Sequence, residues 1–566
     1  MIKRYLLLYY TIFNTRPSQL YHRLRLLIKR TLLSNLANDS FAGKIALPAE
    51  FKVSLASNLP PAVFKPREQF VRTSNNSDLE VGFLNVWQPL QTPMNWHPVE
   101  MKTGTRLWLL NLHYMEFIEA TDTEIWFRFI KDWINRNKPY KKGYWLDDWN
   151  SYALSIRVVV WMQQFERRGG SLSEGDKALF LRSLVGQINF LKSNLELDIG
   201  GNHLVKNIKA LLWASKFFEG PEADCWRELG SKLLRLAIEE QVTPDGVHFE
   251  LSPAYHVQVF ADFLECYTVL DDGETRRELK SILPKMAQFC VDATHPDGMI
   301  SLFSDSGLHM SYSASECLSV FECLLNIKVK QSELIVYPRA GYFGLRNADT
   351  LFLMDAAELA PKYLPGHGHG DALSFEWSVA GQRVAIDPGV FEYNSGDMRA
   401  YSQSTLNHNT VTLDDLDQTE FWKSFRAGRR AKITSCEAIP LLNGISVDAA
   451  HDGYTRLKGK PTHRRRVIIT SGKIEIYDSI LGGDAQHSIA RVMLAPDILV
   501  NQINGQYFLQ GKGFSIKVES DRPISVNDTF CFLDFGHKYQ TKQLIIDMGY
   551  APCKSFMYMN IIPDSR

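Results

Sequence analysis

The sequence predicts a multidomain protein of α and β type, with an N-terminal (α/α) toroid followed by a C-terminal antiparallel β-sandwich. Three observations lead to this fold class. The chain has 566 residues, which is more than a single hydrophobic core usually serves. Apolar residues recur at helical spacing from residue 123 to residue 328. After Tyr337-Pro338 the segments become short, rich in β-branched residues and alternating in polarity.

The helical region consists of amphipathic segments joined by short loops that carry Gly, Pro or Asp. Helices in series with short connections are typical of antiparallel pairs, as in an α/α toroid. No fixed-length repeat is visible, which disfavours a regular solenoid. The segments with helical periodicity are TEIWFRFIKDWINRN, DDWNSYALSIRVVVWMQQFERR, DKALFLRSLVGQINFLKSNLE, NHLVKNIKALLWASKFFE, CWRELGSKLLRLAIEEQV, PAYHVQVFADFLECYTVL and RRELKSILPKMAQFCVDA.

The strand region alternates apolar and polar residues and is broken by Gly, Asp and Asn. This alternating pattern is typical of antiparallel sheets with one face toward water. The expected strands lie in LFLMDAAEL, ALSFEWSV, QRVAIDPG, NTVTLDD, RRRVIITSG, KIEIYDSI, SIARVMLA, YFLQG, FSIKVES and QLIIDMG.

The expected domain boundaries are residues 1–100 for an N-terminal amphipathic segment and lead-in, 101–336 for the toroid and 337–566 for the β-sandwich. MIKRYLLLYYTIF has a basic start and an apolar run that is too short to span a bilayer. No small-residue cleavage site follows it in NTRPSQLYHRLRLLIKR. We expect a basic amphipathic segment that is retained, and we favour packing on the body over contact with a membrane surface.

Composition argues against several classes of function. The 63 Lys and Arg residues balance the 63 Asp and Glu residues, so no global field attracts a polyanion and an acidic ligand needs a local basic groove. No phosphate-binding glycine loop, dinucleotide fingerprint or nucleic-acid module is visible. The eight cysteines form no CxxC pair, so we expect neither a disulfide framework nor a zinc knuckle.

The stretch GGNHLVKN, residues 200–207, places an amide and an imidazole directly after two glycines. Asn202 is either the N-cap of a packed helix or a donor in a site for an anionic group. Both interpretations follow from the N–H groups that a helix N-terminus leaves unpaired. The residues alone leave both open.

Two further stretches combine ionisable side chains with turn residues. In DGVHFELSPAYH, Tyr255 and His256 stand near the start of a helix, where each taken alone is more often a hydrogen-bonded structural residue. In PGHGHGDALSFEW, the glycines let two imidazoles point at one site. Imidazole and carboxylate groups suit zinc, and His369, Asp387 and His408 would make a three-ligand set, although Asp387-Pro388-Gly389 is equally a good turn.

Together these stretches resemble the heparinase II/III-like polysaccharide lyases. The resemblance rests on the NH of residues 202–203, on DGVHFELSPAYH, on GHGHGDALSFEW, on the R-x-Y-x-x-S-T-x-x-HNTV pattern and on HDGYTRLKGKPTHRRRVII. It extends from about Trp108 to the C-terminus. The order of the motifs and the change from helices to strands between them make the match specific. The family has an (α/α) toroid followed by an antiparallel β-sandwich, which is the order predicted above.

The resemblance implies roles for residues of this chain. Asn202, with His203, would neutralise a uronate carboxylate; Tyr255 would be the catalytic tyrosine, and His367 the base or its assistant. Some family members have His where this chain has Asn202, which leaves the accepted uronate epimer open. The expected substrate-binding residues are Arg399, Tyr401 and Glu250. The expected ligands of a mainly structural metal ion, usually zinc, are His369, Asp387 and His408.

Such a protein would be a carbon–oxygen lyase that cleaves uronic-acid glycans by β-elimination, in which the C5 proton leaves and the C4–O bond breaks. A donor such as Asn202 would stabilise the developing enolate, and the glycine pair would let the sugar acid approach a helix N-terminus. Tyr255 would act as base, as acid, or as both in turn with syn geometry. We expect nearby cations such as His367 to lower the pKa of Tyr255 for this role.

Several alternatives stay open at this point. A uronate C5-epimerase would share the proton abstraction, and a non-catalytic glycan-binding protein of envelope or capsule metabolism would share the binding groups. An inverting hydrolase using Asp147-Asp148 and Glu250 ranks low, because the aspartates also suit a helix N-cap. The resemblance favours a periplasmic or envelope location, whereas the cysteine usage and the missing cleavage site favour the cytoplasm. The partner is expected to be an acidic polysaccharide; its identity and sulfation, endo or exo action and the oligomeric state are left open.

Overall fold

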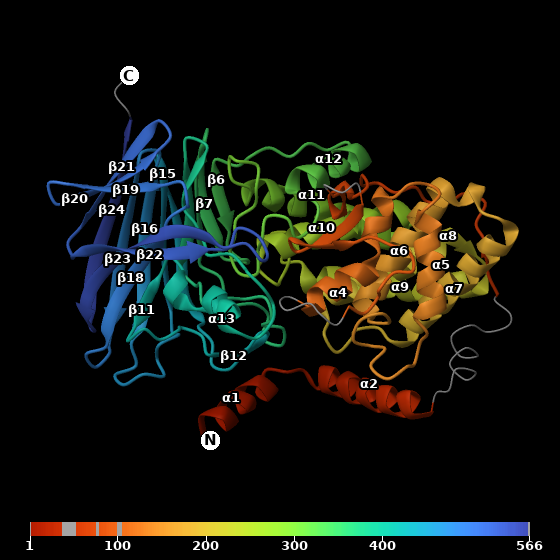
Figure 1. The fold of residues 1–566 in the computed structure, drawn as a ribbon. Helices are drawn as coiled ribbons and strands as arrows, with labels where there is room; N and C mark the ends of the chain where they lie inside the picture. Colours follow the sequence, from red (N-terminus) through yellow and green to blue (C-terminus); the bar gives the residue numbers. More distant parts are fainter. Residues whose placement is uncertain (1, 37–51, 75–77, 99–104, 564–566) are drawn as a thin grey trace. The chain divides into compact units, whose positions relative to one another are not determined.

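The chain divides into two compact units, each described by itself (Figure 1). The computed structural model describes residues 2–36, 52–74, 78–98 and 105–563. The helical unit contains Arg16–Glu240 and Ala261–Leu283. The sheet unit contains Met1–Thr15, Gln241–Phe260 and Pro284–Arg566.

The two units differ from the contiguous domains expected from the sequence. Residues 241–260 and 284–336, expected in the toroid, group with the strands. Hydrogen bonds explain this grouping: His295, for example, lies 2.7 Å from a Glu376 carboxylate oxygen and 2.6 Å from the Ser378 hydroxyl of a strand. Contacts between distant parts of the chain, and not sequence position, therefore set the boundary.

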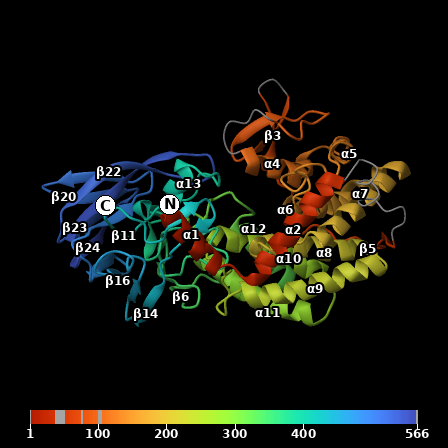
Figure 2. The ribbon, with the colours of Figure 1, turned by 90° about the horizontal axis from the view of Figure 1, so that it is seen from below.

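The helical unit is built around α6, whose side chains are buried over most of its length. Helices α4, α7 and α8 contact α6, and Figure 2 shows α8 beside it. Asn150 caps α6, because its side chain accepts hydrogen bonds from the backbone N–H groups of Tyr152 and Ala153. The N-cap suggested for Asp147-Asp148 is therefore wrong by two residues or more. The helices are α2 (Pro17–Leu36), α4 (Thr105–Tyr114), α5 (Trp126–Arg136), α6 (Ser151–Arg168), α7 (Glu174–Ser193), α8 (Gly201–Phe217) and α9 (Pro221–Gln241).

Two more helices, α10 (Pro253–Val269) and α11 (Glu274–Asp292), contribute residues to both units. The helical unit also holds a three-stranded sheet in the order β2-β3-β4 and a pair of short strands, β1 and β5. These strands are β1 (Ser54–Leu55), β2 (Val71–Thr73), β3 (Leu79–Phe83), β4 (Val86–Pro89) and β5 (Phe218–Glu219).

The sheet unit contains three large antiparallel sheets. The five-stranded sheet has the order β10 (Gln382–Ala385), β9 (Ser374–Val379), β8 (Thr350–Asp355), β7 (Tyr342–Asn347) and β6 (Leu334–Tyr337). The four-stranded sheet has the order β11 (Val411–Leu413), β18 (His487–Met493), β23 (Tyr539–Tyr550) and β22 (Ile524–Cys531). The eight-stranded sheet has the order β14 (Ile433–Leu441), β15 (Gly444–His451), β16 (Thr462–Thr470), β17 (Lys473–Leu481), β24 (Cys553–Pro563), β21 (Phe514–Ser520), β20 (Gln506–Gly511) and β19 (Leu499–Ile503).

One hydrophobic core joins the three sheets, and it draws buried residues from strands of each. Alternation along β16 shows how a strand serves this core while carrying charge: Arg464 and Arg466 are on the outer face, and His463 and Arg465 are buried. Both Arg465 and His463 hydrogen-bond the Asp478 carboxylate of β17, which satisfies the buried charges. The predicted fold class, an (α/α) toroid followed by an antiparallel β-sandwich, is confirmed.

The N-terminal segment forms α1 (Ile2–Phe13) and α2. In the sheet unit, α1 contacts the hairpin of β12 (Phe421–Lys423) and β13 (Arg426–Ala427), and Trp422 Nε1 donates to Thr11 Oγ1 at 3.1 Å. Within the described ranges, no helix is long and apolar enough to cross a membrane.

Candidate active site

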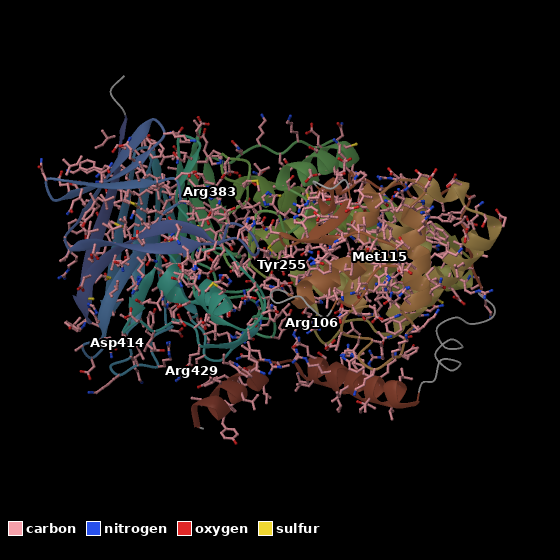
Figure 3. All side chains as sticks on the ribbon, viewed as in Figure 1. Arg106, Met115, Tyr255, Arg383, Asp414 and Arg429 are labelled. Atoms are coloured by element: carbon pink, nitrogen blue, oxygen red, sulfur yellow. The ribbon has the colours of Figure 1, made fainter. Side chains whose placement is uncertain are left out.

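Tyr255, labelled in Figure 3, lies in the first turn of α10. Pro253 opens this helix, at a position where the missing N–H of proline costs nothing. The residue before it fixes the turn, because Ser252 Oγ donates to the Asp305 carbonyl at 3.0 Å and lies 2.9 Å from Ser306 Oγ. The turn of Tyr255 is thereby tied to the segment that contains Asp305.

The Tyr255 side chain is 7% exposed and has two aromatic neighbours. Its hydroxyl lies 2.9 Å from the Tyr393 hydroxyl, and its ring stacks on the His367 ring with a centroid distance of 3.8 Å. Burial, the neighbouring Tyr393 and the Asp305 carboxylate raise the pKa of Tyr255 well above its usual value. The expectation that nearby cations lower this pKa is therefore wrong. Tyr255 keeps its proton at neutral pH and can donate it.

His367 lies between two carboxylates. Its Nδ1 is 2.9 Å from Asp305 Oδ2, and its Nε2 is 3.4 Å from Glu250 Oε2. Glu250 is itself only 1% exposed, and the substrate contact expected for it stays a prediction. The two carboxylates hold the imidazole against the Tyr255 ring.

Asp305 connects most of this site, and the sequence analysis did not single it out. Its carboxylate accepts hydrogen bonds from His367 Nδ1, from His369 Nε2 and from the Arg399 guanidinium. Burial alone would raise the pKa of Asp305, but Arg399 and the two histidines outweigh it and hold this pKa well below its usual range. Asp305 is therefore a buried, ionised carboxylate that orients two imidazoles.

Arg399 and Tyr401 lie on α13 (Asp397–Gln403) and have internal partners. Arg399 is 1% exposed and, besides Asp305, donates to the backbone carbonyls of Gly366 and Ser424. The Tyr401 hydroxyl donates to the Phe530 carbonyl at 2.7 Å. These contacts give Arg399 a positioning role beside Asp305, and the substrate contacts expected for Arg399 and Tyr401 stay predictions.

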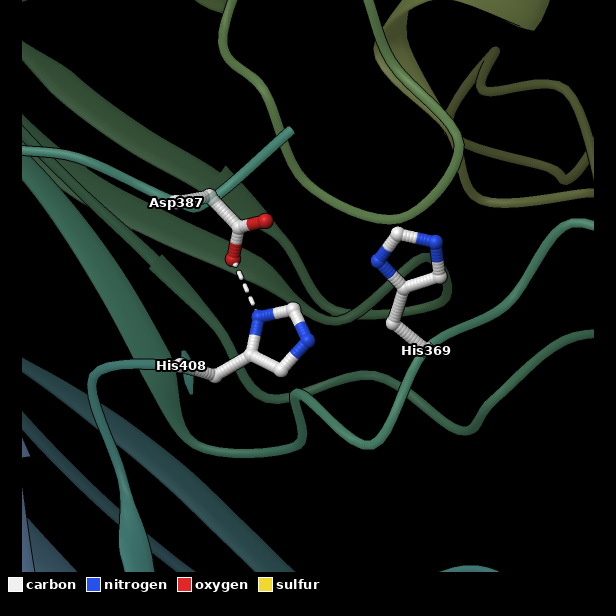
Figure 4. Close-up of side chains that lie close together, drawn as sticks. All are labelled: His369, Asp387 and His408. Carbon is white, nitrogen blue, oxygen red and sulfur yellow. Dashed lines mark hydrogen bonds and ion pairs between the residues drawn. The ribbon is translucent and has the colours of Figure 1, made fainter. Parts of the chain in front are cut away.

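His369, Asp387 and His408 lie together as expected, with their nearest ligand atoms all within 4.8 Å of one another. Figure 4 shows the Asp387–His408 hydrogen bond, which joins Asp387 Oδ2 to His408 Nδ1 at 2.8 Å. The other nitrogen of each imidazole is held by a neighbour. His369 Nε2 donates to Asp305, and His408 Nε2 donates to the Ser402 carbonyl at 3.1 Å.

Two buried polar atoms of this cluster have no hydrogen-bond partner within the described part of the chain, and both are of the kind that binds a metal ion. Among the described residues, His369 Nδ1 and Asp387 Oδ1 are buried without a hydrogen-bond partner. Because His408 Nε2 donates its proton to the Ser402 carbonyl, its Nδ1 is an acceptor, and the hydrogen bond to Asp387 Oδ2 requires a proton on that carboxyl, in line with the raised pKa of Asp387. A cation bound by both atoms would replace this proton, and the Asp305–His369 contact is the outer-shell carboxylate that commonly orients a ligating histidine. The three residues fit a divalent metal ion.

Asn202 and His203 lie in the first turn of α8, in the helical unit. The helix begins at Gly201 with Gly200 as its N-cap, so the alternative in which Asn202 is the N-cap is wrong. Both glycines have positive φ, 76° and 54°, which explains the pair, since other residues rarely adopt this backbone. His203 Nδ1 lies 3.0 Å from a Glu196 carboxylate oxygen, which fixes the ring.

His256, the residue after Tyr255, is fully buried and structural. Its Nε2 donates to the Met286 carbonyl at 2.9 Å, and its Nδ1 accepts the backbone N–H of His248 at 3.1 Å. Burial lowers the pKa of His256 from 6.5 to about 3, against the opposing effect of the Met286 carbonyl. The neutral imidazole is therefore the form that the folded protein holds.

This shift predicts a loss of stability in acid. The unfolded chain protonates His256 near pH 6.5 and the folded protein only near pH 3, so stability falls as pH drops through this window. We expect about 2 kcal/mol of loss through this residue between pH 7 and pH 5. In His256→Gln, whose amide can serve both hydrogen-bonding partners, the drop in Tm between these pH values should be smaller than in the wild type. An equal drop in both proteins would contradict the assignment.

Two family models match the chain. One, described as the Heparinase II/III N-terminus, matches residues 110–326, and the other, described as Heparinase II/III-like, C-terminal, matches residues 330–556. Among curated proteins, a heparin-sulfate lyase of Bacteroides thetaiotaomicron is 24% identical over 411 residues, which are 64% of this chain and 56% of that protein. A heparin-sulfate lyase of Bacteroides stercoris is 29% identical over 248 residues, 39% of this chain and 37% of that protein. The chain thus spans about half or less of the length of these relatives.

Solved structures share the fold. A crystal structure of heparinase III has a TM-score of 0.69 at 18% identity, covering 84% of this chain and 80% of that one. A mutant of heparan sulfate lyase from Pedobacter heparinus has a TM-score of 0.61 at 18% identity, covering 85% of this chain and 80% of that one. A chondroitin AC lyase of Streptomyces coelicolor has a TM-score of 0.51 at 11% identity, covering 81% and 75%.

Proposed function

Because this chain belongs to the heparinase II/III-like family, we propose that it is a carbon–oxygen lyase that cleaves a uronic-acid-containing polysaccharide by β-elimination. The contact of Tyr255 with His367 is the observation that carries this proposal. A tyrosine that keeps its proton, stacked on an imidazole held by two buried carboxylates, is a proton donor in a fixed position. The names of the relatives, heparin-sulfate lyases, favour a glycosaminoglycan as the acidic polysaccharide.

In the proposed reaction, the C5–H bond and the C4–O4 bond of the uronate break and a C4–C5 double bond forms. With syn geometry, Tyr255 gives its hydroxyl proton to the leaving O4 and takes the C5 proton in the same step, so that its oxygen acts as the base while its own proton departs. No proton is gained or lost overall. The raised pKa of Tyr255 supports the donation, because the proton is present when the substrate binds. His367 positions the Tyr255 ring, and Asp305 positions His367.

We extend the proposal to Asn202, whose amide would donate to the uronate carboxylate and stabilise the enolate that forms as the C5 proton leaves. The first turn of α8 supports this role, since the backbone N–H groups of a helix start favour an anion. Asn202→Ala is expected to lower kcat by about 10²-fold, the usual cost of removing one such donor. A lowered affinity with unchanged kcat would assign the residue to ground-state binding instead.

The test of the proposed function is the ultraviolet absorbance of the purified protein mixed with uronate polysaccharides, beginning with heparan sulfate and continuing with hyaluronate and alginate. A rise in absorbance from the conjugated unsaturated uronate supports elimination and identifies the substrate class. Deuterium incorporation at C5 in heavy water without this rise would show a C5-epimerase. Binding with neither signal would show a non-catalytic glycan-binding protein.

We also propose that His369, Asp387 and His408 hold a zinc ion with a structural role. The two imidazoles and one carboxylate are zinc ligands, and the buried atoms without hydrogen-bond partners support a bound cation. The ion would fix the loop that carries His367, two residues from His369.

Removal of the metal is expected to lower Tm, because the ligands are buried and would be left facing one another. Elemental analysis of the purified protein should find zinc in stoichiometric amount. The His408→Ala variant should contain no zinc, and its Tm should be lowered by about as much as a chelator lowers the Tm of the wild type. His487→Ala is the matched control, because His487 also pairs with an aspartate, Asp547, but at the surface. Retention of zinc by His408→Ala would contradict the assignment.

A further inference from the structure

Helix α2 presents its apolar side chains to the outside. They recur at positions i, i+1, i+4, i+7, i+8 and i+12, which lie on one face of a helix. Each of these side chains is between 43% and 64% exposed. A helix of a globular protein normally turns such a face toward the core. The apolar stripe of α2 consists of Leu20, Tyr21, Leu24, Leu27, Ile28 and Leu32.

Polar contacts hold α2 on the helical unit. Gln19 is 4% exposed and donates to the Asp198 carbonyl at 3.2 Å. Lys29 donates to the Ser193 carbonyl at 3.0 Å, at the last residue of α7, where a cation is favourable. On this inner face Leu26 is 1% exposed. The inner face of α2 therefore combines these polar contacts with the buried Leu26, and the residues of the apolar stripe keep 43% or more of their surface exposed.

Helix α1 has the same arrangement in the sheet unit. Its inner face carries Thr11, which bonds Trp422, and Leu7, which lies so close to Gly428 that a side chain there would collide with it. Its outer side chains are between 38% and 73% exposed. The apolar stripe of α1 consists of Tyr5, Leu6, Leu8, Tyr9, Ile12 and Phe13.

The two helices carry positive charge and no negative charge. Residues 2–36 contain no Asp or Glu. Burial foremost, and then the neighbouring Arg25 and Arg30, lower the pKa of Lys29 to about 8. The basic residues of the segment are Lys3, Arg4, Arg16, Arg23, Arg25, Lys29 and Arg30.

We propose that α1 and α2 bind the surface of a bilayer that contains anionic phospholipid, with their apolar stripes inserted at the boundary of headgroups and acyl chains. Leucine, isoleucine and aromatic side chains on one face, basic residues and no carboxylates are the composition of helices that lie in this interface. The inference is independent of the proposed lyase activity.

Two other occupants fit the charges or the apolar surface less well. A second copy of this chain would bring α2 against α2, and basic residues of the two copies would then meet although residues 2–36 offer no carboxylate to pair with them; Arg16 is already paired with Glu240 of its own chain. An acidic polysaccharide would pair with the basic residues but would leave both apolar stripes in water. Anionic lipid satisfies both features at once.

The experiment is co-sedimentation of the full chain with phosphatidylcholine vesicles that contain or lack phosphatidylglycerol, without polysaccharide. We expect at least about tenfold more bound protein with phosphatidylglycerol, decreasing as salt rises. Leu24→Glu/Leu27→Glu should lose this binding, because it places two carboxylates in the stripe while altering exposed positions only. Leu442→Glu is the matched control: Leu442 is 98% exposed in the turn between β14 and β15, and its variant should bind as the wild type does.

Several results would overturn the proposal. One is a wild type that does not sediment with either vesicle, and another is a Leu24→Glu/Leu27→Glu variant that binds as well as the wild type. A wild-type dimer in size-exclusion chromatography that this double variant dissociates, without vesicle binding by either protein, would show that a second copy covers the stripes. Because no substrate is present, failure here leaves the lyase proposal untouched, and failure of the absorbance assay leaves this one untouched.

Discussion

Tyr255→Phe is expected to lower kcat for β-elimination by about 10³-fold, within the range that positioned proton transfer contributes. The substitution removes one oxygen and keeps the ring that stacks on His367. Affinity for the polysaccharide should therefore change little, which calorimetric titration with an uncleaved oligosaccharide can measure. The rate is measured from the ultraviolet absorbance of the unsaturated product.

Tyr477→Phe is the matched control for this variant. Tyr477 also lies with its hydroxyl close to a second tyrosine hydroxyl, that of Tyr558, at 3.1 Å, but on strands β17 and β24. Its loss should leave kcat within about twofold of the wild type, since changes at a distance from the reacting atoms usually have small effects. Turnover by Tyr255→Phe at the wild-type rate would remove Tyr255 from the mechanism.

Asp305→Ala is expected to lower the free energy of unfolding by about 3–5 kcal/mol, the usual cost of removing one partner of a buried ion pair. The variant leaves the Arg399 guanidinium, 1% exposed, without its carboxylate, and it removes the acceptor of two imidazole N–H groups. Thermal and urea unfolding measure the loss. Asp305→Asn keeps the shape of the side chain and should be less destabilised, yet it should also turn over more slowly because His367 loses its charged partner.

Asp448→Ala is the surface counterpart of Asp305→Ala. Asp448 also accepts two hydrogen bonds from one arginine, Arg464, whose side chain is 54% exposed. Water replaces that partner easily, so we expect a cost of no more than about 1 kcal/mol. If Asp305→Ala lowered the free energy of unfolding no more than Asp448→Ala does, the hydrogen bonds around Asp305 would not stabilise the fold as we assign.

The sequence predicted the elements whose periodicity is strong. Each expected helix from residue 123 onward has a counterpart among α5 to α11, and each expected strand lies in the sheet unit. The strands of the sheet unit that were not predicted are β6, β7, β12 to β15, β19, β22 and β24. β14, for example, contains Pro440 and is an edge strand with most of its residues exposed, so its apolar and polar positions do not alternate clearly.

The site was predicted in part. Motif order brought out Tyr255, His367 and the three clustered residues His369, Asp387 and His408. Asp305 was not found, because SLFSDSG has the composition of an ordinary polar loop and the partners of the Asp305 carboxylate are more than sixty positions away. The burial of these side chains could not be predicted from the sequence either. Burial decides both the direction of the pKa shift of Tyr255 and the positioning role of Arg399.

The Asp305 carboxylate has a consequence for how the site can change by mutation. Asp305, His367, His369 and Arg399 share one set of hydrogen bonds, so the effect of altering any of them depends on the other three. A substitution at position 367 alone leaves the Asp305 carboxylate paired with His369 and Arg399, whereas a substitution at 305 removes the partner of all three side chains. New substrate preferences should therefore be easier to obtain by varying position 367 while Asp305 is kept.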